Sequence, residues 1–225
     1  IWFIVKKVDY FAAFGNPSPY KHLWYLGLVF QFYLIITLLA KMLMGKKTKN
    51  NVDIFLCAMV SLAIVSFARL VIVFDINDIS RAYYGTDTRL FEPIIGAIGG
   101  YWYSQKSEQI NSFFARNKNF VNLGLLLLPI FIGLTFIISE YSFWLYKGGF
   151  LLFDLLSLYF IFSVGMGLNK KLARVFSSNI ILIGKISYSL YLWHFPIIIL
   201  TRLNSEVVDI NLFMAVLRLV ASLLV

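Results

Sequence analysis

Long apolar runs separated by short polar stretches dominate the chain. Their predicted positions are 23–44, 53–74, 90–104, 120–140, 150–168, 180–200 and 211–225. A bilayer core requires about 20 apolar residues per helix, so most of these runs are long enough to cross it. The runs are continuously apolar and do not alternate with polar residues, which indicates helices. The pattern therefore predicts an all-α, polytopic membrane helix bundle with about seven transmembrane helices.

Basic residues gather in alternate polar stretches between these runs. The stretches after the first, third and fifth runs hold nine lysines and arginines, or ten with Lys41 at the end of the first run, whereas the three intervening stretches hold four. Lysine and arginine accumulate in the cytoplasmic loops of membrane proteins. The segments that we expect to face the cytoplasm are 45–52, 105–119 and 169–179.

The composition agrees with a membrane protein. Of the 225 residues, 60% are hydrophobic and 14% are charged, whereas soluble domains hold about 45–50% and about 25%. The net charge of +9 fits a nucleic-acid partner, but the basic residues lie between membrane runs, so we expect no nucleic-acid binding. The single cysteine, Cys57, offers neither a disulfide nor a metal site. We expect one domain over residues 1–225, taken from within a longer protein.

Four ionisable side chains lie inside the apolar runs. They are Arg69, Glu92, Asp154 and His194, and with the predicted sidedness they all fall toward the outer half of the bilayer. An ionisable group in a membrane helix is costly and calls for an explanation. Arg69 and Asp154 lie about one turn from their helix ends, so one interpretation is that they extend to the interface. The other interpretation is an outward-open polar cavity built from opposite charges.

His194 shares a helix face with two hydroxyl-bearing residues. Ser187, Tyr191 and His194 follow one another at i, i+4 and i+7, which places them on one stripe of a helix. Tyr188 and Phe195 lie on the adjacent face. The stripe suits a hydrogen-bonded path or the wall of a substrate cleft. A polar contact between two helices is the simpler alternative.

The stretch 81–89 is unusually rich in polar chemistry. It contains Tyr83, Tyr84, Thr86, Asp87 and Arg89 within a few residues. We expect Thr86 or Asp87 to cap the helix that follows, with an acidic residue in its first turn. Capping does not explain two tyrosines and two arginines, Arg81 and Arg89, together. Arg89 has the chemistry to clamp a phosphate or a carboxylate, with Asp87 orienting Arg89 or a tyrosine.

Three segments resemble those of one known family. They resemble signatures of the acyltransferase-3 family of bacterial membrane O-acyltransferases and occur in the family's order. Along the chain they are Phe14–Pro19 with His22–Trp24 and Gln31–Leu34, then Tyr83–Arg89, then Gly184–Pro196. The Pro-Ser-Pro before the tryptophan is most similar to Gram-positive enzymes that O-acetylate peptidoglycan. The resemblance covers most of the chain.

The resemblance implies a multi-pass enzyme of the bacterial cell membrane. It implies transfer of an acetyl group from cytoplasmic acetyl-CoA, the acyl donor, to a hydroxyl of a cell-envelope glycan, without a metal or prosthetic group. Some members carry an extracellular esterase-like domain or partner. The catalytic candidates are Tyr84, Asp87, Arg89, Tyr191 and His194. The substrate-binding candidates are Trp24, Gln31, Tyr33, Arg69, Tyr83, Thr86, Ser187 and Tyr188.

Two departures from the family pattern stand out. The arginine and histidine pair of the family's first helix, which carries the presumed catalytic histidine, is expected upstream of Ile1, so we expect the chain alone to be inactive. Val29 and Phe30 occupy positions where many members have acidic residues. The alternative functions are a carrier or flippase for a sugar or lipid-linked substrate, and a sensory or partner-binding membrane domain.

Overall fold

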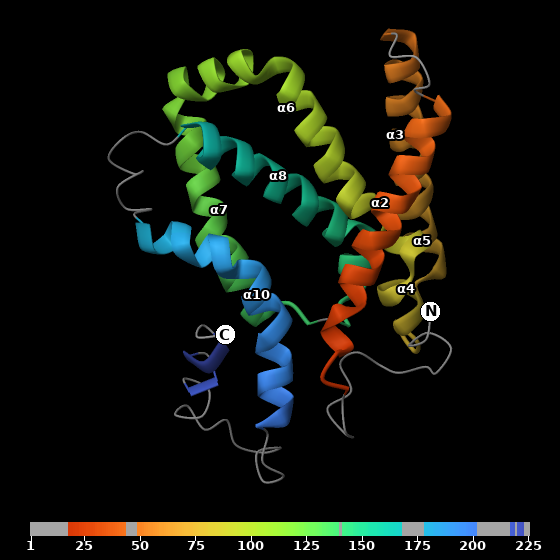
Figure 1. Ribbon diagram of the computed structural model, residues 1–225, viewed down its shortest axis with the longest axis vertical. Helices are drawn as coiled ribbons and strands as arrows, with labels where there is room; N and C mark the ends of the chain where they lie inside the picture. The colour runs from red at the N-terminus through yellow and green to blue at the C-terminus, as the bar shows by residue number, and fades with distance from the viewer. Residues whose placement is uncertain are drawn as a thin grey trace. The chain divides into compact units, whose positions relative to one another are not determined.

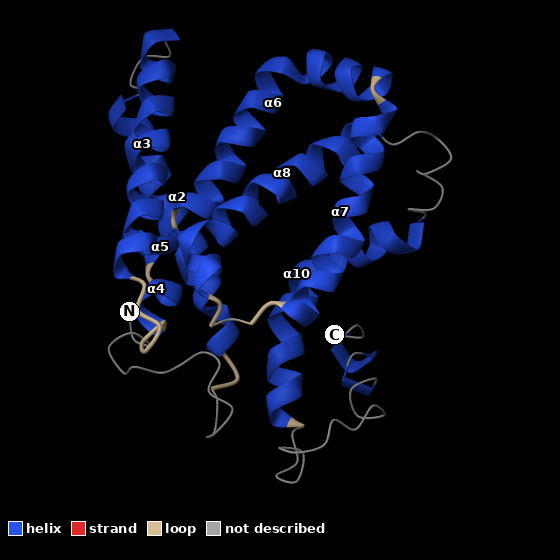
Figure 2. Ribbon diagram, turned by 180° about the vertical axis from the view of Figure 1, so that it is seen from behind, coloured by secondary structure: helices blue, strands red, loops and turns tan. Residues whose placement is uncertain are grey.

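The described part of the chain is helical throughout. The computed structural model describes residues 18–43, 49–139, 141–167, 178–201, 217–218 and 220–222, and these ranges contain no strand (Figures 1 and 2). The long helices are α2 (Trp24–Leu43), α3 (Lys49–Val73), α6 (Phe91–Arg116), α7 (Lys118–Ile137), α8 (Phe150–Gly167) and α10 (Ser178–Leu200). The short ones are η1 (Lys21–Leu23), α4 (Ser80–Tyr84), α5 (Thr86–Arg89) and η2 (Leu145–Gly149). The all-α prediction is confirmed for these residues.

Four of the predicted spans are long and apolar enough to cross a membrane. They are Lys21–Leu43, Asn50–Val73, Lys118–Ile137 and Leu145–Gly165. The runs 90–104 and 180–200 form parts of α6 and α10 but are not among these four. The run 211–225 lies largely outside the described residues, as does the basic stretch 169–177. The described residues therefore support four spans and do not confirm the count of seven.

The polar segment 105–119, which we expected to be a loop, is mostly helical. Helix α6 continues through it to Arg116 and bends at Lys106, whose φ of −130° and ψ of 27° are not helical. Beyond the bend, Ile110 and Phe114 are buried while most of the polar residues are exposed. Apolar residues spaced three to four apart stabilise a helix on an apolar surface even when the other face is polar. That amphipathic spacing is why the segment is a helix.

The chain divides into two compact units, each described here separately. The larger unit comprises 27–169 together with the first nine residues. In its described part, α8 packs along both α6 and α7, and α3 packs against α5 and α6. The polar stretch that is rich in tyrosine and arginine lies on α4 and α5, next to α3 (Figure 1).

Small residues allow the close helix approaches of this unit. A Cβ atom at Gly99 would lie 2.5 Å from Leu158 Cδ1, and one at Gly124 would overlap the Ser163 side chain. Glycine at these two positions lets α6 and α7 contact α8 closely. Phe32, Met59, Leu90 and Ile94 form the adjoining buried cluster. This packing fixes the N-terminal end of α6 against α3.

A π-helical turn, η2, contacts both α3 and α8. Lys147 Nζ donates to the Val71 carbonyl at 2.8 Å, which satisfies a carbonyl near the end of α3. Tyr146 is fully buried and stacks on Phe74 with ring centroids 4.3 Å apart. Gly148 has φ of 145°, a conformation that favours glycine. The turn therefore anchors the start of α8, which carries Phe150 and Asp154, to α3.

The smaller unit comprises residues 10–26 and 170–225. Its described elements are η1, the first turn of α2, α10 and short pieces near the end of the chain. Tyr191 of α10 donates its hydroxyl hydrogen to the His22 carbonyl at 2.5 Å. Arg218 donates to the Thr201 hydroxyl and carbonyl, both at 2.9 Å. These contacts join segments that lie far apart in the sequence.

Candidate functional site

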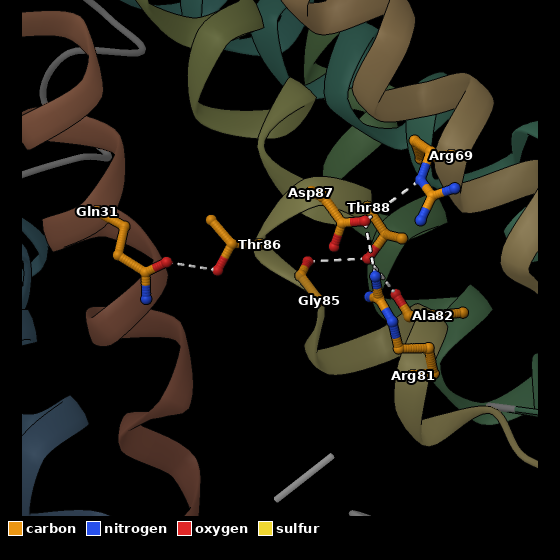
Figure 3. A network of polar contacts seen from close by, with 8 residues as sticks. All are labelled: Gln31, Arg69, Arg81, Ala82, Gly85, Thr86, Asp87 and Thr88. Atoms are coloured by element: carbon orange, nitrogen blue, oxygen red, sulfur yellow. Dashed lines mark hydrogen bonds and ion pairs between the residues drawn. The ribbon is translucent and has the colours of Figure 1, made fainter. Parts of the chain in front are cut away.

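The turn between α4 and α5 is held by its own side chains. The Thr88 hydroxyl lies 2.8 Å from both the Ala82 and Gly85 carbonyls (Figure 3). Thr88 is fully buried, so its hydroxyl requires such a partner. A Cβ atom at Gly85 would overlap the Arg81 guanidinium and would lie 2.9 Å from the Arg81 carbonyl. A glycine is therefore needed here for Arg81 to reach across the turn.

Asp87 accepts from two arginines of different helices. Its Oδ2 lies 2.7 Å from Arg81 Nη2 on α4 and 3.4 Å from Arg69 Nε on α3 (Figure 3). The hydrogen bond from Arg81, followed by its charge and the bond from Arg69, holds the pKa of Asp87 below its usual range. The same bond raises the pKa of Arg81. The cluster of Arg69, Arg81 and Asp87, called here the arginine cluster, carries two positive charges against one negative charge.

Neither Thr86 nor Asp87 caps α6, contrary to the sequence prediction. Thr86 donates its hydroxyl hydrogen to Gln31 Oε1 of α2 at 2.7 Å (Figure 3). The first amide of α6, at Phe91, donates instead to Ser66 Oγ of α3 at 3.1 Å. A hydroxyl from a neighbouring helix thus satisfies an amide that a local cap would otherwise serve. Both candidate caps are used to join helices.

Arg89 is a buried cation held between a carboxylate and two rings. Its Nη1 lies 2.8 Å from Glu92 Oε1, out of line for a hydrogen bond, and the Arg89 side chain is only 7% exposed. The guanidinium carbon lies 3.8 Å from the centroid of the Phe150 ring and 5.3 Å from that of Tyr83. Arg89 Nε makes no hydrogen bond with any residue that the structure describes. The partner of Arg89 is Glu92, in the first turn of α6, and not Asp87 as expected.

Polar groups gather around this arginine inside the bundle. Asp154 of α8 is half-buried and lies within electrostatic range of Glu92 and Arg89. Among the described residues its Oδ2 has no hydrogen-bond partner. Tyr84 is buried, 5% exposed, and meets Tyr83 edge-on at 5.6 Å. This arrangement favours the polar-cavity interpretation for Asp154 over extension to the interface.

Three titratable side chains meet in the smaller unit. The His22 ring lies edge-on to His194, with centroids 5.2 Å apart, and edge-on to Tyr191 at 5.3 Å. The Tyr191 and His194 centroids are 5.9 Å apart. His22 is 3% exposed, and neither of its ring nitrogens makes a well-aligned hydrogen bond with a described residue. We call His22, Tyr191 and His194 the histidine cluster.

The tautomer of His194 follows from its neighbours. Its Nδ1 lies 2.8 Å from the Tyr191 carbonyl and 3.1 Å from the Leu190 carbonyl. Carbonyl oxygens only accept, so Nδ1 carries the hydrogen and Nε2 of the neutral ring keeps its lone pair. His194 therefore has the form of a general base at Nε2.

The predicted stripe on α10 lines a cavity. Ser187, Tyr191 and His194 share the wall of a pocket of about 540 Å³ with Arg218 and Ser222. The Ser187 hydroxyl also donates to the Gly184 carbonyl. Tyr188 is 61% exposed and is not part of this lining. The shared face of the three residues is confirmed.

Two further substrate-binding candidates, Trp24 and Tyr33, lie on α2. Trp24 meets Tyr25 edge-on at 5.5 Å. Tyr33 is 64% exposed and its ring lies 5.4 Å from that of Phe32. In the described part of the chain, no three His, Cys, Asp or Glu side chains gather as metal ligands would.

Sequence reasoning missed His22, Arg81 and Phe150 as members of these clusters. His22 stands 172 positions before His194 in the chain, and periodicity links only residues within one helix. The signal that was available is the segment His22–Trp24, which carries part of the family resemblance. Phe150 lies in a continuously apolar run, where nothing distinguishes it from its neighbours.

Comparison with known proteins identifies relatives along the whole chain. A family model described as an acyltransferase domain matches residues 2–225. The peptidoglycan O-acetyltransferase OatA of Listeria monocytogenes is 35% identical over 228 residues, covering 100% of this chain and 36% of that protein. The O-acetyltransferase OatA of Staphylococcus aureus strain NCTC 8325 is 34% identical over 207 residues, covering 88% and 32%.

Another relative from Staphylococcus aureus has a different name. A putative O-acetyltransferase of Staphylococcus aureus strain COL is 34% identical over 200 residues and covers 88% of this chain. The chain spans about a third of the length of these curated relatives. No solved structure matches it.

Proposed function

This chain belongs to the acyltransferase family, and we propose that the intact protein is a membrane O-acyltransferase. It moves an acetyl group from cytoplasmic acetyl-CoA to a hydroxyl of a cell-envelope glycan, with peptidoglycan as the acceptor. The observation that carries this proposal is the alignment of the whole chain with 36% of a relative named as a peptidoglycan O-acetyltransferase. The lipid bilayer is the protein's environment, with the segments 45–52, 105–119 and 169–179 on the cytoplasmic side.

The chemistry of acyl transfer defines what the site must supply. A hydroxyl oxygen attacks the thioester carbonyl carbon, and the C–O bond forms. The C–S bond then breaks, the thiolate of coenzyme A leaves, and the hydroxyl proton passes through a base to that thiolate. Between these steps the carbonyl oxygen carries negative charge, which nearby positive groups stabilise. The site therefore needs a base and a preorganised cation.

Arg89 supplies the preorganised cation in this proposal. The rings of Phe150 and Tyr83 and the carboxylate of Glu92 hold its guanidinium in place, and a group that is already oriented pays little reorganisation cost during the reaction. Its Nε retains the capacity to donate, since no described residue accepts from it. Glu92 thus takes the orienting role that the sequence suggested for Asp87.

The arginine cluster binds the anionic or hydroxyl-rich parts of a substrate. Its excess of one positive charge (two minus one) lies on partly exposed side chains, which an incoming ligand can reach. Gln31 and Thr86 flank it through their shared hydrogen bond. Tyr84, beside it on α4, is a candidate acceptor or relay hydroxyl.

The histidine cluster supplies acid–base chemistry. His194 has its Nε2 lone pair available because Nδ1 faces two carbonyls. The Tyr191 hydroxyl donates to the His22 backbone carbonyl, so its oxygen can still accept a hydrogen bond from a substrate hydroxyl. Ser187 and Tyr188 on α10 and Trp24 on α2, all of the smaller unit, line the acceptor path in this proposal.

The test is transfer of labelled acetyl from acetyl-CoA to envelope glycan in membranes that hold the intact protein. The wild type is compared with His194→Ala, Arg89→Ala and Arg89→Lys at matched expression. Lys41→Ala, an exposed position at the end of α2, is the control and should transfer normally. Loss of label in His194→Ala and Arg89→Ala, with the variants still folded, is the expected result.

Two outcomes would contradict the proposal. If His194→Ala and Arg89→Ala both keep wild-type transfer, these residues have no part in the reaction. If folded wild-type protein transfers no label to any of several glycans, the carrier or flippase becomes the better hypothesis. Binding of a labelled glycan without transfer would then identify it.

A further inference from the structure

The bend in α6 marks a change in the character of that helix. Residues before Lys106 are mainly apolar, whereas the residues between the bend and Arg116 include Ser107, Glu108, Gln109, Asn111 and Ser112. Ile110 and Phe114 point into the protein and are buried. A helix with one apolar and one strongly polar face lies in the plane of the membrane–water interface. The bend therefore separates the apolar half of α6 from an amphipathic half that suits such an interface.

Beneath this amphipathic half of α6 lies a groove of about 550 Å³. Its walls come from α6, the start of α7 and the second half of α8. The lining residues are Trp102, Lys106, Gln109, Ile110, Phe113, Phe114, Phe120, Leu155, Leu158, Tyr159 and Phe162. We call it the aromatic groove.

The rings of the aromatic groove contact one another around its wall. Phe113 lies 5.2 Å from Phe120 and 5.3 Å from Phe114, measured between centroids. Trp102 lies 6.4 Å from Phe162 on the opposite wall. Trp102 is nevertheless 50% exposed, so the aromatic groove is open on one side. An open apolar groove of this kind at membrane depth is accessible to lipid.

Polar groups are few in the aromatic groove. Among its lining residues, only Trp102, Lys106, Gln109 and Tyr159 carry polar side-chain atoms. The Tyr159 hydroxyl already donates to the Phe120 carbonyl at 2.7 Å. Lys106 and Gln109, both on the part of α6 at the bend, are the side chains suited to a head group, and the Trp102 indole N–H lies on the same helix. The pattern is an apolar channel with one cation at its mouth.

We propose that the aromatic groove binds one acyl chain of an anionic phospholipid, with the lipid phosphate held by Lys106 and Gln109. The apolar walls match an acyl chain, and the ammonium group matches a phosphodiester. The local charge agrees: residues 104–118 contain Lys106, Arg116 and Lys118 against Glu108, which gives three minus one, or +2. Aromatic rings at this depth suit the boundary between acyl chains and head groups.

Coenzyme A fits the aromatic groove less well than a phospholipid. Its adenine and several phosphate groups call for hydrogen-bond partners and more than one cation, and the lining offers one lysine and one carboxamide. The inference is independent of the proposed acyl transfer, because it concerns a lipid that remains bound and is not consumed.

Native mass spectrometry of the purified intact protein tests the proposal. The protein is equilibrated with equal amounts of dioleoyl phosphatidylglycerol and dioleoyl phosphatidylcholine, and retained lipid is counted. We expect the wild type to retain the anionic lipid preferentially. Lys106→Gln should reduce that preference by about fivefold, as expected for loss of one interfacial charge. Leu155→Trp, which fills the aromatic groove from an exposed lining position, should reduce retention of both lipids.

Lys118→Gln is the matched control. It removes a lysine from the same polar stretch that does not line the aromatic groove, and it should leave the preference unchanged. Equal retention of the two lipids by the wild type, or an equal effect of Lys118→Gln and Lys106→Gln, would overturn the proposal. Displacement of the bound lipid by acetyl-CoA at stoichiometric concentration would also overturn it, because the aromatic groove would then be a donor site.

Discussion

At the scale of single residues, three arginines of the larger unit each pair with a carboxylate. Asp87 balances Arg69 and Arg81, and Glu92 balances Arg89. The two sets differ in environment, since Asp87 is 43% exposed at its side chain and Glu92 is 10% exposed. Removing one member of a buried pair leaves an uncompensated charge, whereas an exposed pair is screened by water. We therefore expect substitutions in the two sets to change the stability of the protein by different amounts.

Asp87→Asn should destabilise the protein slightly at neutral pH and not at all in acid. The arginines hold the pKa of Asp87 below its unfolded value, so the stabilising contribution is complete above the unfolded value, near pH 4, and disappears as pH falls through the folded value. Because the groups are partly exposed, we expect a loss of about 0.5–1 kcal/mol. Thermal unfolding of wild type and variant between pH 7 and pH 3 measures it. A difference that stays constant down to pH 3 would contradict the electrostatic origin.

Glu92→Gln should destabilise the protein by about 3 kcal/mol, because it leaves Arg89 buried without its counterion. The double variant Arg89→Met with Glu92→Gln should recover most of this loss, since it removes both charges and keeps an apolar side chain on Phe150. The wild type, Arg89→Met, Glu92→Gln and the double variant form a double-mutant cycle. Their denaturation in one detergent gives the coupling energy between the two side chains. Additive effects of the two substitutions would show that the ion pair contributes little.

Residues that share a helix could be grouped from the sequence, whereas their partners in other elements could not. Ser187, Tyr191 and His194 were placed on one face by the helical period alone, and they line one cavity. The contact of His22 with His194 depends on tertiary packing. The capping prediction for Thr86 and Asp87 was wrong because Ser66 of α3 competes for the same helix end, and local sequence contains no information about that competitor.

At the scale of elements, close helix packing is concentrated at particular glycines. A Cβ atom at Gly124 of α7 would meet the fully buried Ser163 of α8, whereas one at Gly133 of the same helix would have no atom within 4 Å. The helix-forming benefit of alanine over glycine, about 0.5–1 kcal/mol, is common to both positions. The difference in stability between the alanine variants at the two positions therefore measures the effect of packing alone.

Gly124→Ala should lower stability by about 1–3 kcal/mol, because Ser163 is too short to move away and the helices must separate. Gly133→Ala should be neutral or slightly stabilising. Thermal denaturation in detergent, followed by tryptophan fluorescence, compares the two variants directly. Equal stability of both would mean that α7 and α8 can separate at Gly124 without cost.

Element boundaries were predicted well where apolar runs end abruptly. The expected 23–44 and 120–140 correspond to α2 at Trp24–Leu43 and α7 at Lys118–Ile137. The predicted run 90–104 ends well before α6, which continues to Arg116. The second half of α6 is polar, and a polar stretch predicts a loop. A fall in hydropathy marks the residue where an apolar run ends, whereas a helix ends where its backbone hydrogen bonds stop. On an amphipathic helix these two positions differ.

At the scale of the whole molecule, the open question is which helices cross the membrane. Four helices satisfy length and hydropathy, while the alternation of basic residues requires a further crossing between the segments 75–89 and 105–119. Helix α6 is the element that joins these segments. The distribution of charge therefore predicts that α6 spans the bilayer despite Glu92, whose charge Arg89 compensates.

Cysteine labelling decides whether α6 crosses. In a Cys57→Ser background, Asn77→Cys places a single exposed thiol before α6, and Glu108→Cys places one in the half of α6 beyond the bend. With a membrane-impermeant maleimide, we expect Asn77→Cys to react in intact cells and Glu108→Cys to react only after permeabilisation. Labelling of both in intact cells would put the two ends of α6 on one side. Lys106 and the polar half of α6 would then be external.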